Sequence, residues 1–287
     1  MLIQFTITGI SMGMLYALMA MGLILIVKAV GVLNFAHGQL FMLGAYLTWM
    51  LTYQMNLPVW GVAICGLICF AICGLAYMFS VYWPFRNSSW KVTVTISTLG
   101  ASIALKEVVR LIWGSVSLSM APVAPGVTHI GTAYLNNQYF LIIGVGGLLM
   151  LGVYFLFEKT FLGKIMQAVA QDRYEAELIG IPTIIAIACT YMVSMGLSGV
   201  GGWLAAPLFM VSQSLGSMAQ KAFAGIVLGG FGSVKGAVVG GLLIGLIESF
   251  SVLITDSYKD AIVFLVLLIV LVIRPTGIFG EKIDEKA

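Results

Sequence analysis

The chain has 287 residues, of which 61% are hydrophobic and only 9% carry a charge. A mean hydropathy of +1.07 excludes a water-soluble globular domain. The net charge of +3 says little about partners, and no nucleic-acid partner is expected. Apolar runs of roughly 20 residues recur along the chain, which is the length an α-helix needs to cross a bilayer. The runs are continuously apolar instead of alternating, which excludes a transmembrane barrel. The sequence therefore predicts an all-α, polytopic helical bundle in the lipid bilayer.

About nine membrane segments are expected along a single transmembrane domain, 1–287. Their ranges are 6–27, 32–53, 59–82, 92–113, 139–157, 183–204, 221–230, 235–253 and 261–273. The second follows a break at 28–31 and the seventh is too short to span, so some segments are expected to be broken or re-entrant, which leaves about eight or nine. Two prolines within 114–138 predict an irregular external loop, and 205–220 is expected to be a polar loop.

The placement of Lys and Arg predicts the orientation, because these residues concentrate on the cytoplasmic side. If the C-terminus lies in the cytoplasm, only four of the 14 Lys and Arg residues lie on the outer side of the membrane, namely Lys106, Arg110, Lys221 and Lys259. The others then lie inside: Lys28, Arg86, Lys91, Lys159, Lys164, Arg173, Lys235, Arg274, Lys282 and Lys286. This topology predicts a cytoplasmic C-terminus and a cytoplasmic loop at about 159–181.

The segment 163–180, GKIMQAVAQDRYEAELIG, gathers charges that the rest of the chain lacks. We expect one short amphipathic helix over 162–180 that docks on a soluble partner and transmits motion as a rigid lever. A helix lying on the lipid surface is the alternative, but such helices are usually rich in Lys and Arg, and this one is balanced. The residues assigned to coupling are Gly163, Lys164, Asp172, Arg173, Glu175, Ala176 and Gly180.

Polar residues gather where the second segment begins, at Asn34, His37 and Gln39. Broken helices expose backbone groups that polar side chains or water must satisfy, so these residues either line a translocation path or cap a helix. Further pathway candidates are Ser194, Ser198 and Glu248. The two histidines, His37 and His129, lie far apart in sequence and the cysteines lack paired spacing, so neither a metal site nor a catalytic centre is expected.

A glycine-rich stretch runs from Gly225 in the seventh segment to Gly245 in the eighth, with glycines four residues apart. Such spacing allows helix backbones to approach closely in lipid, around a hairpin turned by 230–236. The glycines assigned to packing are Gly225, Gly229, Gly236, Gly240, Gly241 and Gly245. The stretch lacks the GxxxxGK[ST] pattern, so any energy from ATP must come from another chain.

Four sequence features together resemble one family. They are NFAHGQLFMLGAY from Asn34, the spacing of Ala176 and Gly180, the run GGFGSVKGA from Gly229, and RPTGIFG from Arg274. In this combination the chain resembles the permease subunits of branched-chain amino-acid ABC importers, and more narrowly the LivH-type subunit. The general EAAxxxG motif of ABC permeases is degenerate here, with Tyr174, Glu175 and Ala176 at its first three positions.

The resemblance implies a multi-pass importer subunit of a bacterial inner membrane that is not an enzyme and binds no cofactor itself. It implies a homologous second permease subunit in a heterodimer, two cytoplasmic ATPase subunits that bind ATP and Mg²⁺, and a periplasmic substrate-binding protein. The expected cargo is a branched-chain or other apolar amino acid, with urea, short amides or aromatic acids as alternatives. A less favoured alternative is an ion-coupled secondary transporter, which would transport alone under an ion gradient.

Overall fold

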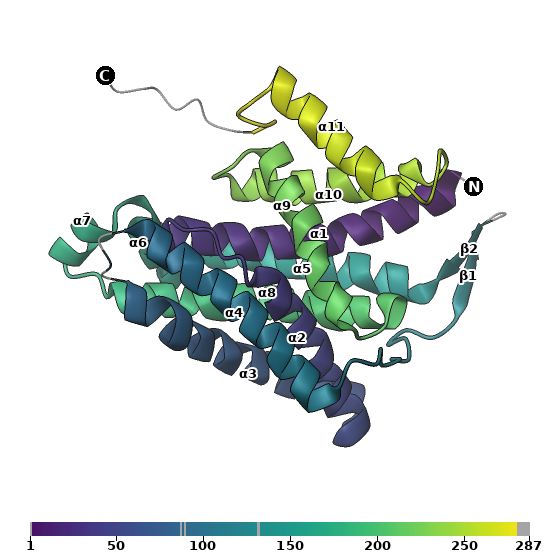
Figure 1. The fold of residues 1–287 in the computed structure, drawn as a ribbon, viewed down its shortest axis with the longest axis horizontal. Coiled ribbons are helices and arrows are strands. Elements are labelled where there is room, and N and C mark those ends of the chain that lie inside the picture. Colours follow the sequence, from purple (N-terminus) through teal and green to yellow (C-terminus); the bar gives the residue numbers. More distant parts are fainter. Residues whose placement is uncertain (1, 87, 89, 131–132, 280–287) are drawn as a thin grey trace.

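The protein is described by a computed structural model covering residues 2–86, 88, 90–130 and 133–279 (Figure 1). Its α-helices are α1 (Leu2–Val30), α2 (His37–Trp49), α3 (Val59–Tyr77), α4 (Lys91–Trp113), α5 (Asn137–Lys159), α6 (Phe161–Gln171), α7 (Arg173–Leu178), α8 (Thr183–Phe209), α9 (Met218–Gly229), α10 (Val234–Ser251) and α11 (Lys259–Ile273). Short helical turns continue α2 (Met50–Gln54) and α3 (Met78–Tyr82, Trp83–Phe85), and a 3₁₀ turn, η4 (Gln213–Ser217), precedes α9. The predicted tail lysines, Lys282 and Lys286, lie outside the described residues.

The expected bundle of membrane helices is confirmed. Six helices within the described ranges are long and apolar enough to cross a bilayer: Leu2–Val30, Val59–Phe85, Val92–Trp113, Asn137–Lys159, Thr183–Phe209 and Val234–Ser251. Three shorter apolar helices, α2, α9 and α11, correspond to the second, seventh and ninth predicted segments. The number of full spans is therefore smaller than the number of apolar segments, because some helices begin or end inside the bundle.

Two loop predictions were wrong in detail. The expected irregular loop 114–138 contains an antiparallel hairpin, β1 (Val127–Ile130) and β2 (Ala133–Asn136), with Val127 opposite Asn136. Valine, threonine, isoleucine and tyrosine favour this extended pairing. The expected loop 205–220 begins later, because α8 continues to Phe209 with Pro207 inside it. Pro207 has no N–H to donate to the carbonyl of Trp203, and Gln138 Nε2 donates to the neighbouring carbonyl of Leu204 at 3.0 Å.

The long axis of the bundle has two distinct ends (Figure 1). The α7 end carries α6 and α7, and the hairpin end carries the start of α1 and the β1–β2 hairpin. α10 finishes at the hairpin end, since Ser249 Oγ donates to the carbonyl of Phe5 at 2.6 Å. Because α1 and α10 run in opposite directions, the turn before α10 lies toward the α7 end.

Helix α1 forms the centre of the fold. In its most apolar window 83% of the residues are buried, against 17% for α4 and for α5, which present apolar faces outward. Most of the fully buried large side chains belong to α1 and α2, including Tyr16, Phe41 and Tyr46. A helix that is apolar on all sides is buried by its neighbours, and α8 and α10 supply that cover.

Glycines let α10 pack tightly between α1 and α9. A Cβ added to Gly241 would lie 2.6 Å from the Cα of Ala17, and one on Gly13 would lie 2.8 Å from the Cα of Leu242. On the opposite side, a Cβ on Gly225 would lie 2.9 Å from the Cα of Gly241. These neighbours are backbone atoms of other helices, so a methyl group fits only if a whole helix moves.

The packing generates a stability prediction. Gly241→Ala should destabilise the purified protein by about 1–3 kcal/mol, because the new methyl group overlaps the α1 backbone. Gly147→Ala is the matched control, since a Cβ at Gly147 in α5 meets no atom within 4 Å. Thermal melting in one detergent measures both variants. Equal melting temperatures for the two would contradict close packing at Gly241.

Candidate functional site

Helix α2 begins inside the bundle, against the middle of two other helices. The Nε2 atom of His37, its first residue, lies 3.0 Å from the carbonyl oxygen of Met19 in α1. The same nitrogen lies 2.8 Å from Ser198 Oγ in α8. Residues 31–36, which precede α2, are non-helical. The chain therefore has irregular backbone at a depth where lipid could not satisfy its polar groups.

Side chains of neighbouring helices hold this irregular segment. Asn34 Oδ1 accepts hydrogen bonds from the backbone N–H of Ala36 at 3.1 Å and from Tyr77 Oη–H of α3 at 2.7 Å. Thr98 Oγ1 of α4 accepts from the N–H of Phe35 at 3.3 Å. These contacts explain why a polar motif stands here in an apolar chain: it replaces hydrogen bonds that a continuous helix would make for itself.

The start of α9 meets the start of α2. A Cβ on Gly38 would overlap the carbonyl of Gly216 and lie 2.7 Å from the Cβ of Ala219. A Cβ on Gly216 would in turn lie 2.8 Å from Gln39 Oε1. The two helices therefore begin at one place inside the bundle, where the positive ends of their backbone dipoles face each other. Such paired helix starts are typical of sites that accept polar solutes within membrane proteins.

The two short helices are approached from opposite ends of the bundle. The chain before α9 comes from the hairpin end, where Val211 and Leu118 exchange two backbone hydrogen bonds. The end of α9 lies toward the α7 end, because the turn from α9 to α10 lines one cavity with Lys28 of α1 and Gln167 of α6. α2 runs the other way, since Trp49 Nε1 near its end donates to the carbonyl of Ser119, in the loop that leads to the hairpin.

Three buried polar atoms near the two helix starts have no hydrogen-bond partner among the described residues. They are Asn34 Nδ2, His37 Nδ1 and Gln39 Oε1. An unsatisfied buried polar group costs about 1–3 kcal/mol, so these atoms are available to water or to a solute. Ser194 Oγ, by contrast, donates to the carbonyl of Gly22 at 2.8 Å. The structure thus brings together five of the six proposed pathway residues around α1 and the start of α2.

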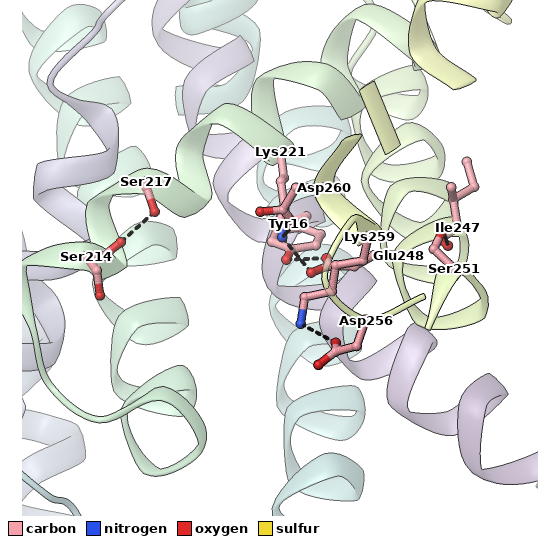
Figure 2. A network of polar contacts seen from close by, with 10 residues as sticks. All are labelled: Tyr16, Ser214, Ser217, Lys221, Ile247, Glu248, Ser251, Asp256, Lys259 and Asp260. Atoms are coloured by element: carbon pink, nitrogen blue, oxygen red, sulfur yellow. Dashed lines mark hydrogen bonds and ion pairs between the residues drawn. The ribbon is translucent and has the colours of Figure 1, made fainter. Parts of the chain in front are cut away.

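Glu248, the sixth, has different partners (Figure 2). Its Oε2 accepts from Tyr16 Oη–H at 2.6 Å, and its Oε1 accepts from Lys221 Nζ at 2.5 Å. Lys221 Nζ also lies 2.8 Å from Asp260 Oδ1 of α11. The sequence analysis did not connect these residues, because Tyr16 and Glu248 are 232 positions apart and share no local spacing. The network ties α1, α9, α10 and α11 together.

The charged segment forms two helices, so the prediction of one helix over 162–180 was wrong. The break is at Asp172, whose Oδ1 accepts from the N–H groups of Tyr174 at 2.8 Å and Glu175 at 3.1 Å. Aspartate is a favoured N-cap, and here its local hydrogen bonds start a new helix instead of continuing the old one. Thr160 caps α6 in the same way, through the N–H of Gly163 at 3.0 Å.

Helix α7 ends in a defined stop. Gly180 has a φ of +82°, its N–H donates to the carbonyl of Glu177, and the N–H of Ile181 donates to the carbonyl of Ala176 at 2.9 Å. This is a Schellman motif, in which Gly180 follows four residues after Ala176, whose carbonyl accepts the N–H of Ile181. The spacing of Ala176 and Gly180 noted in the sequence is therefore the geometry of a helix end.

The residues proposed for coupling divide into buried and exposed sets. Gly163 packs against the backbone of Leu156 and Phe157 at the end of α5, and Ala176 is buried. Lys164, Asp172 and Glu175 are exposed, as is Gly180, while the side chain of Arg173 lies outside the described set. Helix α7 and the residue after it also expose three apolar side chains that the sequence analysis did not assign to coupling: Tyr174, Leu178 and Ile179.

Two distant sequence motifs form one structural unit at the α7 end. The N–H of Ile278 donates to the carbonyl of Leu228 at 3.0 Å, and the N–H of Phe279 to that of Gly229 at 2.8 Å. The segment after α11 therefore satisfies carbonyls at the end of α9, which no further helical turn could reach. A cavity of about 1,040 Å³ lies beside it, lined by parts of α1, α5, α6 and α10.

Comparison with known proteins identifies relatives along nearly the whole chain. A family model described as the permease component of the branched-chain amino acid transport system matches residues 5–271. Two relatives are each 32% identical to this chain, in alignments that cover 99% of this chain and 97% of the relative. They are the high-affinity branched-chain amino acid transport system permease proteins LivH of Salmonella typhimurium and BraD of Pseudomonas aeruginosa. A probable LivH of Methanocaldococcus jannaschii is 28% identical, over 93% of this chain and 89% of its own.

Among solved structures, PsaBC from Streptococcus pneumoniae in complex with Fab aligns with a TM-score of 0.48 and 14% identity. The alignment covers 93% of this chain and 89% of that one. A likeness of this degree supports no conclusion about the chain.

The contacts of His37 generate a second prediction. His37→Leu should destabilise the protein by about 1–3 kcal/mol, because the Met19 carbonyl and Ser198 hydroxyl lose a buried partner. His129→Leu is the matched control, since His129 is an exposed residue of β1. The melting temperature should fall for His37→Leu, recover partly in His37→Gln, and stay near wild type for His129→Leu. An equal fall for the two leucine variants would contradict the role given to His37.

Proposed function

The chain belongs to the branched-chain amino acid transport permease family, and from that premise we propose that it is the membrane subunit of an ATP-driven importer of branched-chain or other apolar amino acids. A permease component transports and is not an enzyme, and the apolar helices make it an integral membrane protein. The observation that carries the proposal is the family match, which runs from residue 5 to residue 271.

The proposed assembly contains more than this chain. Its other members are a homologous second permease subunit, two cytoplasmic ATPase subunits that hold ATP and Mg²⁺, and a periplasmic substrate-binding protein. The sequence contains no P-loop pattern, which supports placing the nucleotide on other subunits and no cofactor on this one. The similarity to Salmonella and Pseudomonas permeases supports a bacterial inner-membrane location. The bias of Lys and Arg supports placing the α7 end, the loop at about 159–181 and the C-terminus in the cytoplasm.

The α6–α7 element is suited to receive motion from an ATPase. Its tip exposes Tyr174, Leu178 and Ile179, which offer apolar anchors to a groove on a soluble partner. Its base is rigidly attached, because Gly163 packs against the end of α5 and Met166 and Val169 enter the core. A force on the tip therefore moves α6 together with the helices it touches instead of bending a loose loop.

A series of packed helices connects α6 to the polar cluster, which is formed by Asn34, His37 and Gln39 at the start of α2. α6 packs against α8 and α1, and the two serines Ser194 and Ser198 on α8 bond to α1 and to His37 at the start of α2. A shift of α8 relative to α1 changes the hydrogen bonds at the place where α2 and α9 begin. The unpartnered atoms there then offer alternative bonds, so that the cluster opens and closes with the ATPase cycle.

Reconstituted transport tests the proposal. Proteoliposomes carrying the chain with its partner permease, ATPases and binding protein should accumulate labelled leucine only when the ATPases have access to ATP. Urea, a short amide and an aromatic acid are tested in parallel as alternative cargoes. Proteoliposomes with the chain alone should show no uptake under a sodium or proton gradient. Gradient-driven uptake by the chain alone would overturn the proposal.

A third prediction concerns the tip of α7. Leu178→Glu should reduce ATP-driven uptake roughly tenfold, because it places a charge in an apolar docking contact. The loss of binding free energy should be similar to that at an interface hot spot. Leu178→Met keeps the apolar contact and should stay near wild type. Gln171→Glu, which adds the same charge at the exposed end of α6, controls for charge alone. Uptake by Leu178→Glu equal to that by Gln171→Glu would show that the tip does not dock.

A further inference from the structure

The cavity of about 1,040 Å³ beside the end of α9 has charged side chains at one end. Lys28 lies in the last turn of α1, Glu158 in the last turn of α5 and Lys235 in the first turn of α10, and all three line the cavity. The ends of spanning helices lie near the boundary between hydrocarbon and water. The charged end of the cavity is therefore at the depth of lipid headgroups.

The rest of the cavity extends away from that boundary and is apolar. Its lining runs along α1 from Lys28 to Met21 and along α5 from Glu158 to Met150. At a rise of 1.5 Å per residue these stretches reach about 10 and 12 Å from the charged end. The side chains on the way include Leu25, Val153, Phe157 and Val238. Pockets for drug-sized ligands measure roughly 300–1,000 Å³, so this cavity has room for a headgroup and part of an acyl chain.

The charged end carries a surplus positive charge. Neither Lys28 nor Lys235 forms an ion pair or a side-chain hydrogen bond within the part of the chain that the structure describes. Two lysines and one glutamate, Glu158, line the cavity, which gives a net charge of +1. The start of α10 adds the positive end of a helix dipole. This end of the cavity therefore favours an anion.

We propose that the cavity binds one anionic phospholipid of the phosphatidylglycerol type. Its phosphodiester lies between Lys28 and Lys235, and an acyl chain fills the apolar interior. The single negative charge of the phosphodiester brings the net charge of the site to zero. Basic pockets between membrane helices bind anionic headgroups in this way. A zwitterionic phospholipid brings no net charge and leaves the surplus positive charge in place.

A helix of another subunit fits this cavity less well than a lipid. Such a helix would cover Lys28, Glu158 and Lys235, and covered charges need charged partners. A lipid keeps its headgroup at the water boundary, so the lysines stay hydrated while they pair with the phosphodiester. Its flexible chain also adapts to the irregular wall formed by four helices.

The bound lipid would connect parts of the chain that are distant in sequence. Met166 and Gln167 of α6 line the cavity on one side, and Phe279 of the segment after α11 lines it on another. The lipid therefore supports the base of the α6–α7 element. The inference does not depend on which solute is transported.

Native mass spectrometry of the full chain, alone and in any complex that copurifies with it, tests the inference. Phosphatidylglycerol and phosphatidylethanolamine with the same acyl chains are titrated in parallel. Phosphatidylglycerol should bind at least roughly fivefold more tightly, because only its headgroup neutralises the lysines. Glycerol 3-phosphate at the same concentration should not displace it, because this soluble anion has no acyl chain for the apolar interior.

Lys28→Gln and Lys235→Gln should each weaken phosphatidylglycerol binding roughly fivefold and leave phosphatidylethanolamine binding near wild type. The double variant should bind both lipids equally. Both lysines are exposed, so the fold tolerates the changes. Lys159→Gln is the matched control, because Lys159 is an exposed lysine at the same end of α5 and does not line the cavity.

Equal binding of the two lipids by wild type, or a preference that survives in the double variant, would overturn the site. An equal loss in Lys159→Gln would reduce the effect to general surface charge and would also overturn it. Displacement by glycerol 3-phosphate would show a site for free phosphate only. A copurified complex that excludes phosphatidylglycerol would show that a protein partner fills the cavity instead.

Discussion

The fold depends on one constraint: backbone polar groups inside a membrane need partners within the protein. Two helices, α2 and α9, begin within the bundle; non-helical backbone precedes α2, and irregular backbone followed by the 3₁₀ turn η4 precedes α9. Asn34, Tyr77 and Thr98 satisfy the first of these segments, and backbone pairing between Leu118 and Val211 anchors the second. The starts of α2 and α9 meet at Gly38 and Gly216, so the bundle contains a polar site surrounded by apolar side chains. A transport route requires such a place, and a bundle of complete helices would not provide it.

Close helix packing keeps that place in position. α10 reaches α1 and α9 through glycines on both of its faces, and α1 is buried along most of its length. The outer helices α4 and α5 are mostly exposed, so they are the surfaces available to lipid and to other subunits. In the proposed importer, a rigid centre and an attached α6–α7 element would carry motion from one end to the helix starts without unfolding the core.

Sequence reasoning predicted what periodicity and composition encode. Long apolar runs indicated the membrane helices, and the polar motif at Asn34 and His37 indicated a broken segment. The split between α6 and α7 was missed because Asp172 is compatible with a helix by propensity alone, and only its capping bonds show the break. The network of Tyr16, Lys221, Glu248 and Asp260 was missed because contacts between distant helices leave no pattern in one sequence. The hydrogen bonds between the segment after α11 and the end of α9 could not be predicted for the same reason.

Import driven by cytoplasmic ATPases requires that mechanical work enters the bundle from the cytoplasm at α7. The direct measurement is labelling of an introduced thiol by a membrane-impermeant maleimide, in a variant whose cysteines Cys65, Cys69, Cys73 and Cys189 are replaced by alanine. Glu175→Cys, at an exposed position of α7, should react in inside-out vesicles and not in right-side-out vesicles. Asp256→Cys, at the hairpin end, should show the reverse. Labelling of Glu175→Cys from the outside of intact cells would contradict the account.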